Sequence, residues 1–388
     1  MITEILLLCG CTYLYKNWWK IKLKIKFKDI VKSNSKFTNK SNTSITCYMI
    51  SKEEYGYKLF IKLPYSYTLK DLYKDMDIFK EGLMLDSLQI ENDKHISLNC
   101  ICNYEFKDYK PIRYPPNKLL ICSSLTSHIC VDINKFPHVL IGGDTGTGKS
   151  RILLLMLTNL IHHNKNIDIH LLQLRKNDLG VFNNCMQVKS ICNNLNDILN
   201  TLININNECI RRESLIDNTK GIYNIEDYIK KHGDLHYVYV VIEEFSFLNK
   251  SQGDSKQEKI LKQQCLKYIK TIVNVGRSSG VFLITALQKP TADSIPSDIK
   301  SQLCTRISLR IEDPSTSKVI LGDESASKLS EREVIIKTNT KQYGYSYTIN
   351  HQMIMENIKD SITNKKIKIT NTNANLDNIL EVLDEINR

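Results

Sequence analysis

The chain has 388 residues, 42% hydrophobic and 24% charged, a composition that excludes extensive disorder and a length that allows two domains. Its net charge is +11, from 53 Lys and Arg against 42 Asp and Glu. Residues 16–40 hold nine lysines and one acid, so most of this charge is local and does not by itself indicate a nucleic-acid partner. The twelve cysteines include no C-x-x-C pair, which argues against a zinc site and indicates reduced thiols.

An apolar run at 5–15 is followed by a Trp pair. The run is shorter than the roughly 20 residues of a bilayer crossing, but Trp favours the lipid–water boundary and lysines accumulate on the cytoplasmic side. We expect residues 1–40 to attach the protein to a membrane, with the chain after Lys16 in the cytoplasm. The alternative is the first buried element of a soluble domain. Residues 20–28 alternate lysine with apolar residues, which predicts an edge strand and also a polybasic segment attracted to anionic lipid.

Residues 41–115 are predicted to form a small α+β domain. Their pattern indicates two strands, a helix and two further strands, with apolar residues at helical spacing in the helix. The five segments are 45–51, 56–63, 69–83, 86–92 and 95–106. None carries a catalytic pattern, so we expect a packing or oligomer-interface role. Three prolines within 109–116 mark the boundary with the next domain.

Residues 143–150 read GDTGTGKS, the G-x-x-x-x-G-K-S pattern of a phosphate-binding loop. An apolar strand at 139–141 precedes it and an apolar helix at 151–161 follows, which is the required order. Lys149 is expected to reach the β- and γ-phosphates, and the Ser150 hydroxyl to bind Mg²⁺. A glycine-rich turn with a solvated lysine is the alternative, and it fits this context less well. The predicted nucleotide-binding residues are Gly143, Asp144, Thr145, Gly146, Thr147, Gly148, Lys149 and Ser150.

A second buried strand is predicted at 237–242, with the continuous apolar pattern of a parallel sheet, and it ends at Glu243 and Glu244. By position, Glu243 would lie beside Mg²⁺ and its water shell, and Glu244 would act as general base towards the attacking water. The alternative is a charged strand end that faces solvent. A third strand at 281–286 leads to Gln288, which would sense hydrolysis at the γ-phosphate. These strands predict an open α/β fold with ligands at the carboxyl ends of the strands.

From about residue 116 to residue 347, the chain resembles the motor domain of the FtsK/SpoIIIE family of DNA translocases, in the branch found on conjugative elements. The blocks that carry the resemblance, in the family's order, are FPHVLIGGDTGTGKS, IRRESLI, GIYNIEDYIKK, YVYVVIEEFSFL and VGRSSGVFLITALQKPTADSIPSDIKSQLCTRISLRI. Three positions depart from the family pattern. Glu243 replaces the usual Asp, Leu287 replaces a hydroxyl residue before Gln288, and residues 173–175 replace D-P-K. These departures bear on the rate of hydrolysis more than on the fold.

The resemblance implies a P-loop NTPase motor with a mainly parallel, RecA-like sheet at 116–350, followed by a tail at 351–388 with an amphipathic helix at 376–386. It also implies ATP and Mg²⁺ as cofactors and a homo-hexameric ring that pumps DNA through a central channel. A neighbouring subunit's arginine would stabilise charge on the γ-phosphate. The candidates are Arg277 and Arg306, and the alternative for each is an internal ion pair. Contacts to DNA would be phosphate-directed and sequence-independent, hence strongly salt-dependent.

The sequence therefore favours an ATP-driven DNA translocase that acts as a coupling protein and moves plasmid or integrative-element DNA during conjugation. Its motor would work at the cytoplasmic face of a bacterial cell membrane, with a relaxase and pore proteins as partners. One alternative is a protein-secretion ATPase of the same superfamily, disfavoured because those usually carry tandem ATPase domains and this chain has one phosphate loop. Another is a weakly hydrolysing DNA-binding adaptor, suggested by Glu243 and Leu287.

Overall fold

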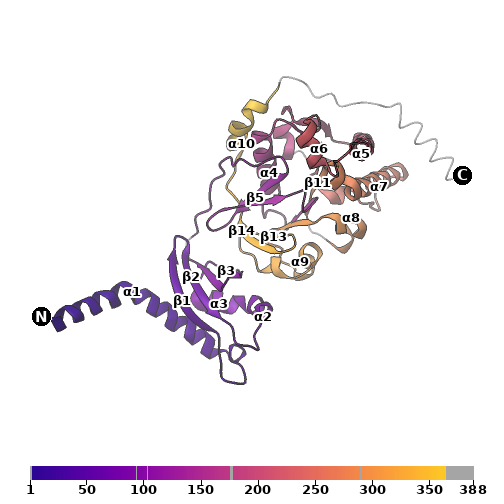
Figure 1. The fold of residues 1–388 in the computed structure, drawn as a ribbon. Coiled ribbons are helices and arrows are strands. Elements are labelled where there is room, and N and C mark those ends of the chain that lie inside the picture. Colours follow the sequence, from indigo (N-terminus) through magenta and orange to yellow (C-terminus); the bar gives the residue numbers. More distant parts are fainter. Residues whose placement is uncertain (1, 93, 103, 175–177, 289–290, 364–388) are drawn as a thin grey trace. The chain divides into compact units, whose positions relative to one another are not determined.

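The chain divides into two compact units, Met1–Glu105 and Phe106–Arg388, each with its own hydrophobic core (Figure 1). The residues that the computed structural model describes are 2–92, 94–102, 104–174, 178–288 and 291–363. The side chains of residues 2–17 lie outside this description, as does the amphipathic helix expected at 376–386.

The N-terminal unit is built on a four-stranded antiparallel sheet with the strand order β1-β2-β4-β3. Its strands are β1 (Thr46–Glu53), β2 (Gly56–Lys62), β3 (Ser87–Asn92) and β4 (Ile96–Ile101). The predicted helix at 69–83 is present as two helices, α2 (Leu69–Lys74) and α3 (Met76–Leu83), because Asp75 ends the first and begins the second. The predicted order of strands and helix is confirmed.

Helix α1 (Ile2–Ser33) contains the segment at 20–28, for which the alternation of residues predicts an edge strand. That prediction is wrong, and the segment is helical. Apolar residues at every second position also recur at every fourth position, and residues four apart lie on the same face of a helix. Leu23, Phe27 and Val31 therefore share one helix face, and Phe27 and Val31 are only 2% exposed. The Phe27 ring stacks on that of Phe79 in α3, with centroids 5.4 Å apart. This half of α1 is part of the core of the N-terminal unit.

The outer face of α1 is basic. Lys22, Lys24 and Lys28 are exposed, and the Lys22 amine lies 5.8 Å from the ring centroid of Trp18, which is 53% exposed. Within the described part of the chain, no helix is both long and apolar enough to span a bilayer.

A ten-stranded mixed sheet forms the centre of the second unit, in the order β6-β5-β14-β13-β12-β7-β11-β10-β8-β9. The strands from β12 to β9 run parallel, and the strands from β6 to β13 pair antiparallel. The strand bounds are β5 (Lys118–Ser123), β6 (His128–Asp132), β7 (Val139–Gly143), β8 (Ile167–Leu172), β9 (Val188–Cys192), β10 (Tyr237–Ile242), β11 (Val281–Gln288), β12 (Thr305–Ser308), β13 (Glu333–Lys337) and β14 (Lys341–Tyr345).

Helices cover both faces of this sheet, and each face has its own core (Figure 1). One face packs against α4 (Lys149–His163), α6 (Ile225–His232) and α10 (His351–Ile358). The other packs against α5 (Leu195–Asp217), α7 (Lys256–Ser279), α8 (Ser297–Gln302) and α9 (Pro314–Leu321). Short 3₁₀ turns are η1 (Ser35–Phe37), η2 (Asp178–Phe182), η3 (Phe245–Leu248), η4 (Ala292–Ser294), η5 (Ser325–Lys328) and η6 (Lys359–Ser361). The predicted α/β P-loop fold with a mainly parallel sheet is confirmed.

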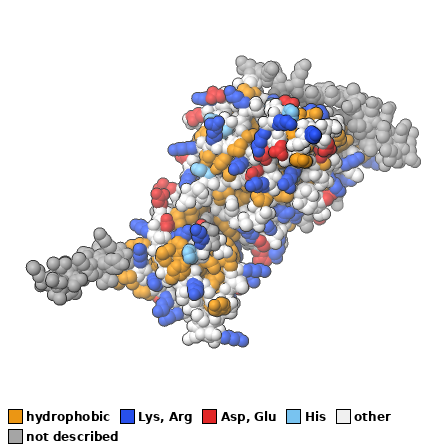
Figure 2. Space-filling model, in the orientation of Figure 1, with side chains coloured by type: hydrophobic (Ala, Val, Ile, Leu, Met, Phe, Trp, Pro, Cys, Tyr) orange, Lys and Arg blue, Asp and Glu red, His pale blue; other side chains and the backbone are white. Residues whose placement is uncertain are grey.

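The surface of the second unit mixes charges of both signs. Figure 2 shows Lys and Arg side chains interspersed with acidic ones over the visible face. This agrees with the near-neutral composition of the chain after residue 40. Charge alone therefore does not indicate which part of this unit would bind a polyanion.

Candidate active site

The carboxyl ends of three neighbouring parallel strands meet at one edge of the large sheet. In register, Gly143 of β7 pairs with Gln288 of β11, and Thr285 of β11 pairs with Ile242 of β10. The sheet therefore brings the predicted phosphate loop, the predicted glutamate pair and Gln288 together, although up to 145 residues separate them in sequence.

The phosphate loop turns through glycine conformations that other residues adopt at a cost. Gly146 and Gly148 have φ values of +83° and +107°, in the left-handed region. A Cβ added at Gly146 would meet no atom within 4 Å, so the loop leaves open space there. Helix α4 begins at Lys149, directly after the loop, and its amino end directs N–H groups and partial positive charge towards that space. These features fit a bound phosphate.

Lys149 lies folded over this loop. Its side-chain amine donates to the carbonyl oxygens of Gly143 and Asp144, at 2.7 Å each, and the residue is only 6% exposed. The ammonium group thus lies beside the loop backbone. Two further bonds shape the loop, because the Asp144 carbonyl oxygen also accepts from the Thr147 hydroxyl at 2.8 Å and from the Thr147 N–H at 3.3 Å.

Asp144 connects the loop to the segment that follows β12. Its N–H donates to the carbonyl of Arg310 at 3.1 Å, and its Oδ2 accepts from the N–H of Glu312 at 2.8 Å. The sequence patterns did not mark Arg310, whose half-exposed guanidinium pairs with Glu312 at 3.3 Å. Its place could have been inferred only from the pairing of β12 with β7, which no local motif encodes.

Ser150 contacts an acid that the sequence patterns missed. The Ser150 hydroxyl donates to Oδ2 of Asp178 at 3.0 Å. Asp178 begins η2, a few residues after the end of β8. An acid soon after a buried strand is the one signal that could have suggested it, and β8 reads as such a strand.

Glu243 and Glu244 follow β10 and are buried, at 4% and 5% exposure. The two carboxylate oxygens of Glu244 accept from the N–H of Gln288 at 3.0 and 3.2 Å, and Oε1 also accepts from the Ser246 hydroxyl at 2.6 Å. Glu244 thus joins the ends of β10 and β11. The alternative of a charged strand end facing solvent does not describe these buried carboxylates.

The two candidate arginines lie elsewhere. Arg277, near the end of α7, donates from Nε to the carbonyl of Asn134 at 3.1 Å and is exposed. Asn134 precedes β7, so Arg277 is at the amino edge of the sheet, opposite to the phosphate loop. Arg306 in β12 donates to the backbone carbonyls of Lys300, Leu303 and Ile320. Within one chain, the hydrogen bonds of both arginines therefore go to backbone carbonyls away from the loop.

The donor set suits a magnesium ion held largely by a nucleotide. Mg²⁺ is usually bound by one or two carboxylates together with substrate phosphates and waters, and not by an all-protein cage. Among the described residues, no group of three or more His, Cys, Asp or Glu side chains could hold a metal ion alone. Ser150, with the Asp178 carboxylate beside it, matches a site in which the nucleotide and water supply most of the magnesium ligands.

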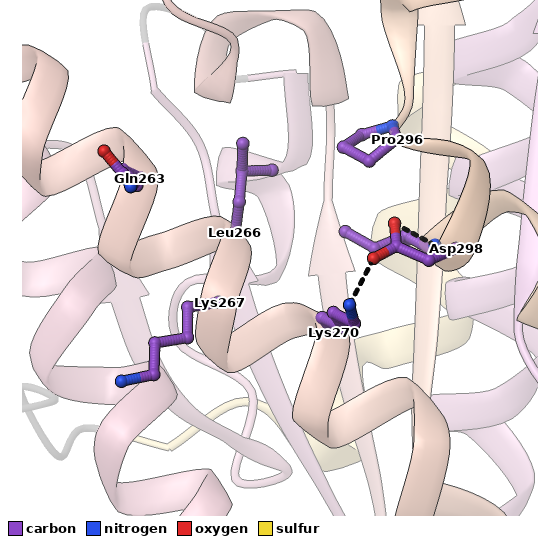
Figure 3. A pocket seen from close by; sticks show the side chains of 7 residues that line it. Gln263, Leu266, Lys267, Lys270, Pro296 and Asp298 are labelled. Carbon is purple, nitrogen blue, oxygen red and sulfur yellow. Dashed lines mark hydrogen bonds and ion pairs between the residues drawn. The ribbon is translucent and has the colours of Figure 1, made fainter.

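A separate cavity of about 220 Å³ lies between α7 and α8 (Figure 3). An ion pair between Lys270 and Asp298, at 2.6 Å, joins its two walls. No residue of the phosphate loop lines it, so it is not part of the candidate active site. The lining residues are Gln263, Leu266, Lys267, Lys270, Pro296, Asp298 and Ile299.

Comparison with known sequences identifies related ATPases. The sequence model of the FtsK/SpoIIIE family matches residues 113–334. DNA translocase FtsK of Campylobacter jejuni subsp. jejuni serotype O:23/36 (strain 81-176) is 30% identical over 208 residues, which cover 52% of this chain and 21% of that protein. The chain thus spans about a fifth of the length of this relative.

Solved structures share the fold, among them the following two. The pCW3 conjugation coupling protein TcpA, in a monomer form with ATPgS, matches with a TM-score of 0.64 and 18% identity, over 87% of this chain and 99% of that chain. The cytoplasmic domain of the type VII secretion ATPase EccC of Thermomonospora curvata matches with a TM-score of 0.53 and 19% identity, over 69% of this chain and 34% of that chain.

Proposed function

This chain belongs to the FtsK/SpoIIIE family of ATPases, and from that membership we propose that it is an ATP-driven DNA translocase that acts as a coupling protein in conjugative DNA transfer. The observation that carries the proposal is the meeting of the phosphate loop, Glu244 and Gln288 at one sheet edge. Gln288 pairs in register with Gly143 of β7 and donates its N–H to the Glu244 carboxylate.

Each site residue then has a chemical role. The loop N–H groups and Lys149 would bind the β- and γ-phosphates. Ser150 and Glu243 would hold Mg²⁺, which would neutralise phosphate charge. Glu244 accepts a proton from the attacking water as general base. Because the Gln288 N–H holds the Glu244 carboxylate, a change at the base is transmitted to the end of β11, where Gln288 senses the γ-phosphate.

The motor is proposed to act as a homo-hexamer, in which a neighbour's arginine completes each site. Arg277 suits this role better than Arg306. The Arg277 guanidinium is exposed at a sheet edge, whereas three backbone carbonyls of its own chain hold that of Arg306. DNA would pass through the ring, held at its phosphates independently of sequence.

The N-terminal unit is proposed to hold the motor at the cytoplasmic face of the cell membrane. The basic outer face of α1, with Trp18 and the exposed lysines, suits a surface of anionic lipid, where each lysine contributes about 1 kcal/mol. A relaxase and pore proteins would then be further partners.

The similarity in fold to TcpA supports conjugation as the setting, and the similarity to EccC supports protein secretion as the second candidate. Activation of ATP hydrolysis separates the two. Stimulation by DNA supports the translocase, and stimulation by a secreted protein without any response to DNA would replace it. If the wild-type protein binds DNA but hydrolyses no ATP above background, the adaptor alternative holds.

The test of the motor itself is Lys149→Ala, with Lys165→Ala as control because Lys165 is exposed beyond the end of α4. We expect Lys149→Ala to lose DNA-stimulated ATP hydrolysis by at least about 100-fold, since removing a preorganised charge at a phosphoryl site costs roughly 3–4 kcal/mol. The thermal midpoint should stay near that of the wild type. Undiminished hydrolysis in a folded Lys149→Ala protein would overturn the proposal.

A further inference from the structure

Asp178 occupies a defined position beside the phosphate loop. Strands β8 and β10 are neighbours in register, Leu172 beside Ile242, so the carboxyl end of β8 lies next to Glu243. Leu179 and Phe182 of η2 are completely buried and anchor the turn. The Asp178 side chain is exposed on this anchored turn, with Oδ2 at 3.0 Å from the Ser150 hydroxyl. The packing of η2 therefore sets where this carboxylate lies.

We infer that Asp178 is a positioning residue for the Mg²⁺ of bound ATP, an inference that rests on the proposed function. A serine hydroxyl has one hydrogen and two lone pairs. Asp178 takes the hydrogen in its hydrogen bond with Ser150, which leaves the oxygen lone pairs directed away from the carboxylate. The hydroxyl is thus oriented as a metal ligand before any ion arrives.

The negative charge of Asp178 also favours metal binding by the Ser150 hydroxyl. A hydroxyl that binds a cation becomes a stronger hydrogen-bond donor, and a carboxylate acceptor strengthens both interactions. Outer partners of this kind typically change metal affinity by 10- to 100-fold when removed. Glu243 follows β10, the strand beside β8, so Asp178 would supply a second carboxylate on this side of the loop. Lys149 supplies the positive charge on the phosphate side.

The experiment measures nucleotide affinity and not turnover. A fluorescent ATP analogue is titrated into the full chain in buffer with Mg²⁺ and in buffer with EDTA. The variants are Asp178→Ala, which removes acceptor and charge, and Asp178→Asn, which keeps an acceptor oxygen without the charge. Asp360→Asn is the matched control, because Asp360 is an exposed acid in the first turn of η6. Lys149→Ala is the reference for loss of phosphate binding.

We expect Asp178→Ala to weaken binding about tenfold or more in Mg²⁺ and to leave binding in EDTA unchanged. Asp178→Asn should lose less, and Asp360→Asn should behave as the wild type in both buffers. An equal loss in both buffers, or no loss in Mg²⁺, would overturn the inference.

Failure of the proposed function looks different from failure of this inference. If the wild-type chain does not bind the analogue in either buffer, the proposed function fails. If wild type and Lys149→Ala differ while Asp178→Ala matches the wild type in Mg²⁺, only the inference fails. Thermal melting of the ligand-free variants checks the fold, and Asp178→Asn keeps the test valid if Asp178→Ala does not fold.

Discussion

His138, the residue before β7, is fully buried and uses both ring nitrogens in hydrogen bonds. Nδ1 accepts from the N–H of Leu283 at 3.0 Å, so Nε2 carries the hydrogen and donates to the carbonyl of Val273 at 2.9 Å. This arrangement requires a neutral ring, and burial lowers the pKa of His138 to about 4. One imidazole thus joins β7, β11 and α7 at the end of β7 opposite the phosphate loop.

The low pKa of His138 makes stability depend on pH. The unfolded chain has a histidine pKa near 6.5, so it binds a proton more readily than the folded chain does between pH 6.5 and about 4. This contribution to the free energy of unfolding is complete above pH 6.5, and roughly 3 kcal/mol of it is lost by pH 4.

His138→Asn tests this assignment. Asparagine tolerates the φ of +59° at this position, but it leaves the Val273 carbonyl without its donor, so the variant should be less stable than the wild type at pH 8. Its urea midpoint should then fall less than that of the wild type between pH 8 and pH 5. If the two proteins lose the same stability over this interval, His138 is not the titrating group.

Among the helices and strands, a prediction is confirmed where the local sequence fits only one periodicity, either that of a strand or that of a helix. The strand predicted at 237–242 is β10, Tyr237–Ile242, because six residues that are all β-branched or aromatic fit a strand buried on both faces. The alternation of lysine and apolar residues at 20–28 fits both the two-residue period of a strand and one face of a helix. Packing against α3 favours the helix.

The candidate active site also combines features that the local sequence predicts with features that it does not. The glycine turns of the predicted phosphate loop could be foreseen because consecutive residues determine them. The places of Asp178 and Arg310 could not, because they depend on the order of strands in the sheet, which brings η2 and the end of β12 to the loop. Local patterns do not contain that order.

The contact between α7 and β11 depends on Gly276. A Cβ at this position would lie 2.2 Å from the carbonyl oxygen of Val281 and 2.9 Å from Cε1 of His138. Backbone cannot yield as a flexible side chain does, so Gly276→Ala should destabilise the second unit by about 3 kcal/mol or more. Gly253→Ala is the control, since its Cβ would have only the Ser251 hydroxyl at 4.0 Å. Thermal midpoints of both variants measure the difference, and a Gly276→Ala midpoint equal to that of the control would contradict this close contact.

For the whole molecule, the location of charge is more informative than its sum. The lysines of residues 16–40 lie on and after a helix whose other face is buried in the N-terminal unit. Residues 16–40, the basic arm, are therefore not separable from that unit. Membrane attraction, if these lysines provide it, acts on a folded body and not on a free tail. Removing the arm to test the motor would also remove part of a core.

Two shortened chains separate the part of α1 before Trp18 from the part that packs in the core of the N-terminal unit. A chain that begins at Trp18 keeps Phe27, Val31 and Phe37, which are at most 2% exposed. A chain that begins at Ser41 loses all three, each contributing about 1.5–3 kcal/mol of burial, a sum comparable with the whole stability of a small domain.

We expect the chain that begins at Ser41 to be cut by trypsin throughout its N-terminal unit, and the chain that begins at Trp18 to resist as the full chain does. Limited digestion with mass mapping of the fragments measures this. Because the second unit has its own cores, it should survive digestion in both shortened chains. Equal protection of the N-terminal unit in both chains would mean that α1 contributes charge but not stability, contrary to the burial of Phe27 against Phe79.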